Sequence, residues 1–330
     1  MLDEMLRHLF KTRYSEWRPL SASVADGIVI HALTQVNDSI LATPPPLGHP
    51  TWHEKGYAGF RGLKITDIPF DWNNLEIDYE KLGEISGSRK FSIAIEGRSL
   101  ILFPPDFRLL VEKLMGTPLW YDGAHVMGLI ASGLFPNPID FGASVLSGST
   151  QKTLSGPLGG VILSNDDEAM ESIRSATAND TATPDYGRIA GLAATMIEWN
   201  YIGKSFAADI IGNARMLAES LHDEGLGVLM EDRGFTKTHQ IALLCPGHID
   251  ANHGAKMLSA ANILTTPFPI PDGNGGTRQV LRLGTTEITR TGFDRHHMPL
   301  IAKAIAAAFK DNKEAIARVK SIVASLPKRS

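Results

Sequence analysis

The sequence has little of several features that would restrict its function. It contains one cysteine among 330 residues, so no disulfide can form within the chain, as is typical of a reducing compartment. The net charge of −4 provides no basic surface for nucleic acid or an anionic membrane. No apolar run reaches the roughly 20 residues of a membrane span, and the acidic start is not typical of a secretory signal. These absences predict a cytoplasmic protein without nucleic-acid or membrane partners.

Short apolar runs alternate with segments of helical periodicity over the first two thirds of the chain. We predict strands at residues 38–43, 91–95, 118–122, 143–147 and 160–164, with helices that include residues 24–33 and 107–115. Strands that alternate with helices favour an α/β fold whose mostly parallel sheet is covered on both faces. Such a sheet places its ligands at the carboxyl ends of its strands.

The pattern changes in the last third of the chain. Two long helical patterns fall between residues 186 and 223, and a strand at 238–244, a helix at 251–261 and a strand at 279–283 follow. A long helical region then covers residues 298–323. This mixture is α+β in character, so we predict a large α/β domain at 1–205 and a smaller C-terminal domain at 206–330.

Lys152 lies in a loop whose composition is unusual for a surface lysine. Residues 147–150 are small or hydroxylic, and Gly156-Pro157 and Gly159-Gly160 follow, so the backbone turns tightly. A lysine after a strand is most often solvated. A lysine that is confined in a dry pocket or beside a cation has a lowered pKa, which a Schiff-base lysine needs.

Asp122 lies at the end of a predicted strand, three residues before His125. The common use of such an aspartate is to cap the following helix, and a lone histidine is more often structural. A carboxylate at this place could instead keep the ring nitrogen of pyridoxal phosphate protonated. The lysine and this acid are the two groups that such an enzyme needs most.

The segment from residue 19 to residue 26 precedes an apolar helical pattern. Its two serines and the backbone N–H groups of a helix start form a good phosphate cradle, although the segment taken alone favours a plain N-cap. No metal site is predicted.

These segments together resemble the serine hydroxymethyltransferase family of pyridoxal phosphate-dependent enzymes. The resemblance rests on residues 121–130 (YDGAHVMGLI) and 149–163 (STQKTLSGPLGGVIL), and it extends over about residues 18–293. It implies a fold-type-I transferase, with a mostly parallel sheet between helices and a smaller α+β C-terminal domain. It also implies a small amino-acid substrate and a dimer.

The resemblance assigns roles to individual residues. Lys152 is the Schiff-base lysine, Asp122 pairs with the ring nitrogen, His125 lies by the cofactor and His49 stacks on the ring. We predict Lys152, His125 and His49 as the catalytic residues, and we add to the cofactor-binding set Ser21, Ala22, Ser23, Ser99 and Gln151. Arg282 falls on the arginine that binds the substrate carboxylate, for which a bidentate guanidinium is well suited.

The sequence departs from the family at four places, one of which is residues 181–184 (TATP) in place of the family's Gly-Gly-Pro, which meets the partner subunit's phosphate. Gln151 stands where members usually have histidine, and glutamine cannot take up a proton. Residues 264–268 lack the asparagines of the family's folate site, so the use of tetrahydrofolate is doubtful. The family's N-terminal segment, with a glutamate and tyrosines that do proton work, has no counterpart before the matching region.

We therefore predict an enzyme of amino-acid or one-carbon metabolism that acts at Cα or Cβ of a small amino acid. Hydroxymethyl transfer, aldol cleavage and transaldolation all fit. In a first alternative, the chain is one subunit of a split enzyme, and a second small chain supplies the N-terminal segment in a hetero-oligomer. In a second alternative, the chain is a non-catalytic binding protein, against which the retention of Lys152, Asp122, His49 and Arg282 argues.

Overall fold

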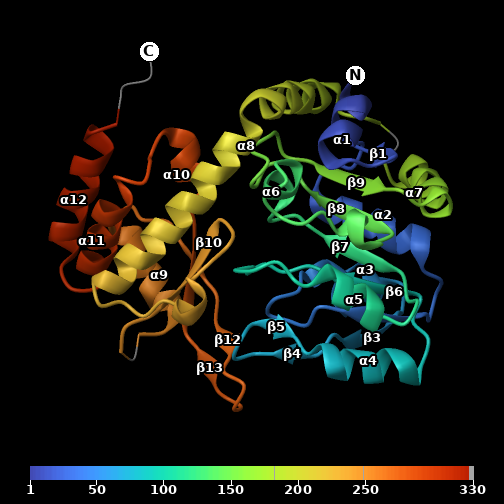
Figure 1. The fold of residues 1–330 in the computed structure, drawn as a ribbon, viewed down its shortest axis with the longest axis horizontal. Helices are drawn as coiled ribbons and strands as arrows, with labels where there is room; N and C mark the ends of the chain where they lie inside the picture. The colour runs from blue at the N-terminus through green and yellow to red at the C-terminus, as the bar shows by residue number, and fades with distance from the viewer. Residues whose placement is uncertain (182, 248, 327–330) are drawn as a thin grey trace. The chain divides into compact units, whose positions relative to one another are not determined.

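The computed structural model describes residues 1–181, 183–247 and 249–326 (Figure 1). The chain forms two compact units. The first unit comprises Met1–Asp71, Leu75–Ser99 and Pro105–Lys204. The second comprises Trp72–Asn74, Leu100–Pro104 and Ser205–Ser330.

A seven-stranded mixed sheet forms the centre of the first unit, in the order β1-β9-β8-β7-β6-β2-β3. Its five strands from β3 to β8 pair in parallel, whereas β9 is antiparallel to β8 and β1 is antiparallel to β9. The mostly parallel α/β sheet predicted from the sequence is thus confirmed. The strands are β1 (Tyr14–Glu16), β2 (Ser39–Ala42), β3 (Lys64–Asp67), β6 (Ile93–Glu96), β7 (Leu119–Asp122), β8 (Val145–Ser149) and β9 (Gly160–Ser164).

Helices cover the sheet and connect its strands. These are α1 (Leu2–Phe10), α2 (Ala22–Leu33), α3 (Tyr57–Phe60), α4 (Tyr79–Ser88), α5 (Phe107–Lys113), α6 (Met127–Ala131) and α7 (Asp167–Asp180). Two 3₁₀ turns, η1 (Pro50–Trp52) and η2 (Pro138–Phe141), and a small hairpin of β4 (Phe70–Asp71) and β5 (Glu76–Ile77) complete the unit. Three of these helices begin at an aspartate whose side chain accepts a hydrogen bond from a backbone N–H group, and these are Asp78, Asp106 and Asp166.

The central strands are apolar on both faces because side chains alternate along a strand and both faces are covered. Alternate residues such as Ile40, Trp120 and Ile162 join a cluster with apolar residues of α2 and α7. Tyr121 faces the other way, and its ring meets that of Phe107 on α5 at a centroid distance of 4.9 Å. Asp122 follows Tyr121 and therefore lies on the face covered by α2.

The second unit is built around a three-stranded antiparallel sheet, in the order β10-β14-β11. Its strands are β10 (Gln240–Leu244), β11 (Thr266–Pro267) and β14 (Val280–Gly284), and a separate pair consists of β12 (Ile270–Pro271) and β13 (Thr277–Arg278). The other elements are η3 (Glu231–Arg233), α9 (Ala251–Ala260), α10 (Thr286–Thr291), α11 (Met298–Ala308) and α12 (Asn312–Ala324).

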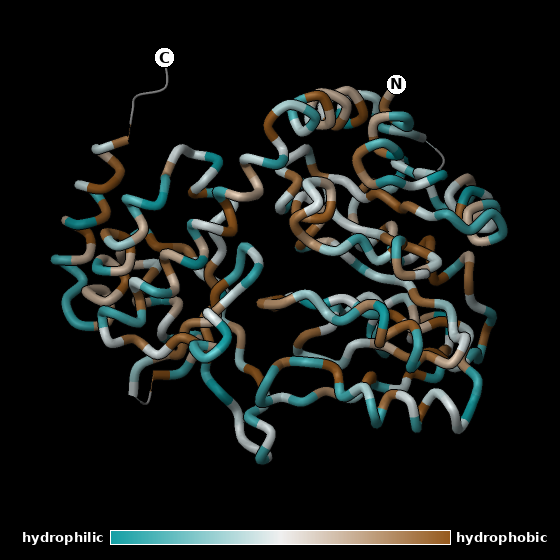
Figure 2. Tube along the Cα trace, in the orientation of Figure 1, coloured by the Kyte–Doolittle hydropathy of each residue, from teal (hydrophilic) through white to brown (hydrophobic). Residues whose placement is uncertain are grey.

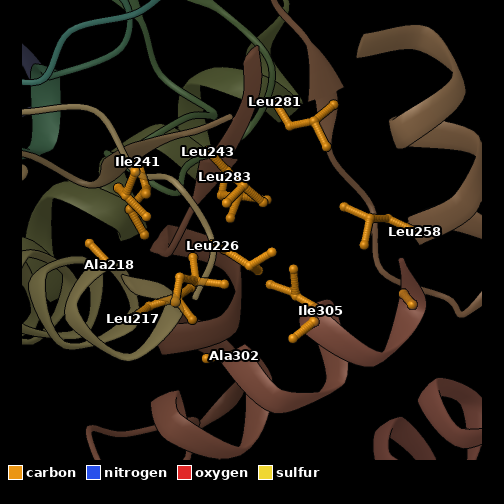
Figure 3. Packing of buried hydrophobic residues seen from close by; sticks show 14 of the residues in the cluster. Leu217, Ala218, Leu226, Ile241, Leu243, Leu258, Leu281, Leu283, Ala302 and Ile305 are labelled. Atoms are coloured by element: carbon orange, nitrogen blue, oxygen red, sulfur yellow. The ribbon is translucent and has the colours of Figure 1, made fainter. Parts of the chain in front are cut away.

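The core of the second unit forms where the sheet and the helices meet. Figure 3 shows Ile241, Leu243 and Leu283 of the sheet near Leu217 of α8 (Tyr186–Asp223) and Ile305 of α11. Leu281 and Leu258 belong to the same buried cluster. Helices such as α12 alternate hydrophobic and hydrophilic residues along their turns (Figure 2), as expected of helices with one buried face. No helix of the described residues is long and apolar enough to cross a membrane.

Two predicted helical regions were wrong in their extent. The two patterns between residues 186 and 223 form one helix of 38 residues, α8 (Tyr186–Asp223). Gly203 does not end it, because a Cβ there would lie 2.5 Å from the Trp199 ring and the glycine makes room for that indole. Conversely, residues 298–323 form two helices, because Asp311 accepts hydrogen bonds from Lys313 and Glu314 and starts α12.

Removal of a core side chain of the second unit tests this packing. Leu281 is 0% exposed, and we expect Leu281→Ala to lower the free energy of unfolding by about 2–5 kcal/mol because it leaves a cavity. Leu264→Ala is the control, because Leu264 is 85% exposed and its truncation should change stability by less than about 0.5 kcal/mol. Urea titrations followed by circular dichroism measure both values. Equal stabilities would contradict the packing.

Candidate functional site

One cavity of about 250 Å³ lies at the carboxyl ends of β6, β7 and β8 in the first unit. This position is the one at which parallel α/β sheets bind ligands. The cavity collects every residue that the sequence predicted for the cofactor, namely Ser21, Ala22, Ser23, His49, Ser99, Asp122, His125, Gln151 and Lys152. It is also lined by residues that the sequence reasoning did not select, among them Asp26, Trp52, Arg98 and Ser149.

Lys152 is carried by the connection between β8 and the antiparallel strand β9. Backbone hydrogen bonds from Thr150 to Gly159 and from Gly156 to Thr150 close this connection. The hydroxyl of Thr153 donates to the carbonyl of His125 at 3.0 Å, which fastens the lysine loop to the loop after β7. As a result, the Nζ atom of Lys152 lies 3.2 Å from Nε2 of His125.

Asp122 ends β7 and is 8% exposed. Its Oδ1 atom accepts a hydrogen bond from the backbone N–H of Ala124 at 2.8 Å. Burial raises the pKa of the Asp122 carboxyl from 3.8 to about 6, and the positive charge of Lys152 and the hydrogen bond from Ala124 oppose this rise. A second cation placed against Asp122 would add to the effect of Lys152, lower the pKa of the carboxyl and keep it ionised at neutral pH.

The start of α2 lies against the end of the sheet. The Ser21 side chain accepts from the backbone N–H of Val24, so the predicted N-cap is confirmed. A Cβ at Gly160 would lie 2.3 Å from the carbonyl oxygen of Ser21, so only glycine lets β9 come this close. The free N–H groups and serines of this helix start line the cavity, where the helix dipole favours an anion.

His49 and Trp52 enter the cavity from the turn η1. Their ring centroids are 5.8 Å apart, and Trp52 in turn packs edge-on against Trp120 of the sheet. Burial lowers the pKa of His49, and the positive charge of Lys152 lowers it further. His49 is therefore a neutral imidazole at neutral pH.

A buried ion pair that the sequence reasoning missed lies beside Asp122. The guanidinium of Arg98 contacts the Glu96 carboxylate at 2.6 Å, and Arg98 also lines the cavity. Burial raises the pKa of Glu96, and the charge of Arg98 opposes the rise. Glu96 stands out in the sequence as an acid in an otherwise apolar strand. The fold is needed to show that Arg98 turns back to pair with it.

Arg282 lies on β14 in the second unit, 5.4 Å from the centre of the Phe268 ring. Burial lowers its pKa. Gln151 is exposed and precedes Lys152 on the rim of the cavity. No group of three or more His, Cys, Asp or Glu side chains among the described residues is arranged to hold a metal ion.

The side chains of the cavity fit the chemistry of pyridoxal phosphate. The start of α2 suits a phosphate, the buried carboxylate suits a ring N–H, and the lysine suits an aldehyde. Asp26 and Trp52 each keep a buried polar atom without a hydrogen-bond partner among the described residues. The α/β unit and this set of side chains define a fold-type-I pyridoxal phosphate enzyme.

Comparison with known proteins gives the same class. A family model described as serine hydroxymethyltransferase matches residues 4–305, so the chain belongs to the serine hydroxymethyltransferase family. It is 34% identical to an alpha-methylserine aldolase from Variovorax paradoxus, over 95% of this chain and 72% of that protein. It is also 34% identical to a serine hydroxymethyltransferase from Thermoplasma acidophilum, over 97% of this chain and 78% of that protein.

A solved structure supports the fold over nearly the whole chain. L-threonine transaldolase from Pseudomonas fluorescens superimposes with a TM-score of 0.90 at 25% identity, and the match covers 99% of this chain and 76% of that one. The predicted family resemblance, the fold-type-I fold and the class of pyridoxal phosphate-dependent enzymes are thus confirmed.

The raised pKa of Asp122 predicts a pH-dependent stability. In the folded chain this carboxyl holds its proton up to about pH 6, whereas an unfolded aspartate loses it near 3.8. The folded state therefore binds more protons in this window, and the free energy of unfolding falls as pH rises from about 4 to about 6. We expect Asp122 to contribute about 2 to 3 kcal/mol of this loss in cofactor-free protein.

Asp122→Asn removes the titrating group and should flatten this part of the profile. Urea unfolding at a series of pH values measures it. Asp209→Asn is the control, because Asp209 is exposed and its replacement should leave the slope as it is in the wild type. Identical slopes in the wild type and Asp122→Asn would show that Asp122 does not titrate in this range.

Proposed function

We propose that this chain binds pyridoxal phosphate and breaks or forms the Cα–Cβ bond of a small β-hydroxy-α-amino acid without folate. The observation that carries the proposal is the coupling of two charges in one cavity, where the Lys152 amine opposes the rise in pKa of the buried Asp122 carboxyl. When bound, pyridoxal phosphate supplies an electron sink that stabilises negative charge at the α carbon of an amino acid.

The residues of the cavity have separate tasks in this proposal. Lys152 would hold the cofactor through its amine, and Asp122 would face the ring nitrogen with its carboxylate. Ser21, Ser23 and the N–H groups of α2 would bind the phosphate. His125 keeps the Lys152 amine in place through the 3.2 Å contact at Nε2, and a proton can be held between these two nitrogens.

The cleavage balances without a further reactant, and the transfer reaction needs only a second aldehyde. The Cα–Cβ bond breaks, its electron pair stays at the α carbon, the β-hydroxyl gives up its proton, and the β carbon leaves as an aldehyde. The α carbon then takes up a proton or adds to a second aldehyde. The serine, α-methylserine and L-threonine in the names of similar proteins all carry the β-hydroxyl that this cleavage needs.

Arg282 is our candidate for the substrate carboxylate, because a guanidinium pairs with a carboxylate through two parallel hydrogen bonds. Its neighbour Phe268 supports a reaction without folate. The aromatic ring packs on Arg282 in the stretch 264–268, which has no amide side chain. An aromatic ring offers no hydrogen bonds to a polar pteridine, whereas an asparagine would offer both a donor and an acceptor.

We also propose that the enzyme is a homo-oligomer of copies of this chain. Large side chains of α8 in the first unit are exposed, including Tyr186 at 75% and Tyr201 at 81%. Exposed apolar and aromatic groups on one helix are typical of a surface that a second copy covers. We also propose that the chain works in the cytoplasm.

Covalent trapping tests the role of Lys152. We expect the purified protein with pyridoxal phosphate to absorb visible light, and borohydride reduction to attach the pyridoxyl group to Lys152, as read by peptide mass spectrometry. Lys152→Ala should lose the label completely because it removes the amine. Lys90→Ala, at an exposed lysine, should keep it. Label on other lysines, with none on Lys152, would contradict the assignment.

Aldehyde release tests the use of folate. With L-threonine, L-serine or α-methyl-L-serine and no tetrahydrofolate, we expect the holoenzyme to release aldehyde, measured by its enzymatic reduction. Added tetrahydrofolate should not change this rate, because the Phe268 stretch does not bind the pteridine. A reaction that proceeds only with tetrahydrofolate would contradict the proposal, and a calorimetric titration with tetrahydrofolate gives an independent check of binding.

A further inference from the structure

A second aspartate lines the cavity, and the roles described so far do not use it. Asp26 lies on α2, is 1% exposed, and faces the same side of the sheet as Asp122. Its Oδ1 atom has no hydrogen-bond partner among the described residues. Its Oδ2 atom lies 2.8 Å from the hydroxyl oxygen of Thr51. A buried acid in this position needs an explanation, because a carboxylate with so few partners is costly.

Thr51 connects Asp26 to His49. The hydroxyl oxygen of Thr51 lies 2.9 Å from Nδ1 of His49, in addition to its contact with Asp26. The backbone N–H of Thr51 also points at Nδ1, at 3.3 Å. Three contacts therefore link the acid, the alcohol and the imidazole, and the hydrogens available to them can be counted.

Only one assignment of hydrogens satisfies all three contacts. If Asp26 is ionised, the single hydroxyl hydrogen of Thr51 goes to the carboxylate, and His49 has to carry a hydrogen on Nδ1 to reach Thr51. The backbone N–H of Thr51 would then face another N–H. If Asp26 is a neutral acid, it donates to Thr51, the hydroxyl donates to Nδ1, and the backbone N–H donates to the same lone pair.

We propose that Asp26 is a neutral acid in the folded enzyme and that, through Thr51, it fixes His49 in the tautomer with its hydrogen on Nε2. Asp26 is then a positioning residue that acts on His49, which is the imidazole assigned to the ring of the cofactor. The catalytic meaning of this inference rests on the proposed function, whereas the protonation of Asp26 and the tautomer of His49 do not.

The electrostatics of the cavity agree with this geometry. Burial raises the pKa of Asp26 well above its ordinary value, and the nearby Asp122 raises it further. The Thr51 hydroxyl, the charge of Lys152 and the Ser147 hydroxyl oppose the rise without cancelling it. Burial lowers the pKa of His49, and Lys152 and His53 lower it further. The ring is therefore neutral, with one hydrogen on either Nδ1 or Nε2. A neutral Asp26 also leaves Asp122 as the anion of this wall, without a second carboxylate competing for a cationic ring.

Nitrogen NMR of histidine measures the tautomer directly. The full-length chain is labelled with ¹⁵N-histidine, and the His49 signals are those that His49→Gln removes. In long-range ¹H–¹⁵N spectra, we expect an acceptor Nδ1 and a protonated Nε2 in the wild type. Asp26→Asn should keep this pattern, because its amide N–H donates to Thr51 as the neutral acid does. Infrared spectra should show a neutral carboxylic acid carbonyl band that Asp26→Asn loses.

Thr51 supplies a matched pair of variants. Thr51→Val removes the hydroxyl and leaves only the backbone N–H at 3.3 Å to hold Nδ1, so we expect the tautomer with hydrogen on Nδ1 to become partly populated. Thr51→Ser keeps the hydroxyl and should keep the single tautomer. A wild-type His49 with hydrogen on Nδ1, or on both nitrogens, would overturn the proposal, as would a tautomer that changes in Asp26→Asn. The wild-type spectrum decides even if a variant does not fold.

The spectra are recorded before and after loading with pyridoxal phosphate, and borohydride trapping at Lys152 reports the loading. Failure to trap the cofactor would count against the proposed function, while the unloaded spectrum would still decide the state of Asp26. Normal trapping with the opposite tautomer would overturn the inference about Asp26 and leave the proposed function standing.

Discussion

The site depends on one electrostatic constraint, which is that the Lys152 cation has to stay close to the buried Asp122 carboxyl. Burial of the Asp122 carboxyl favours its neutral form, and the charge of Lys152 offsets part of that effect. Hydrogen bonds between the two loops that carry these groups hold them together. The hydroxyl of Thr153 ties the lysine loop to the loop after β7, and Ser149 donates to the carbonyl of Ala124 at 2.9 Å.

Three buried acids at the end of the sheet are stabilised in three different ways. Glu96 has a direct ion pair with Arg98 at 2.6 Å. Asp122 has a backbone N–H and the field of Lys152, which suits a group that has to remain able to ionise. Asp26 contacts a threonine hydroxyl, which suits a neutral acid. If all three acids were ionised and had no such partners, the repulsion between their charges in a medium of low dielectric would be severe.

The sequence predicted the parts of the site that are encoded locally. Lys152, Asp122 and Ser21 stand in short loops at the ends of strands or at a helix start, and parallel strands bring such loops together at one edge. Asp26 was missed because an acid in the apolar run of α2 faces the cavity only once that helix packs on β8 and β9. The continuous α8 was missed because helical periodicity does not show whether two neighbouring patterns join, whereas the structure packs Gly203 against the Trp199 ring within one helix.

The residue before Lys152 is Gln151, so the protonation of His49 carries more weight. A glutamine side chain neither gains nor loses a proton near neutral pH. The imidazoles lining the cavity, among the described residues, are then His49 and His125. His125 is engaged with the Lys152 amine through Nε2, whereas His49 is held through Nδ1 by Thr51. The two rings are therefore restrained through opposite nitrogens, His49 by Thr51 and His125 by Lys152.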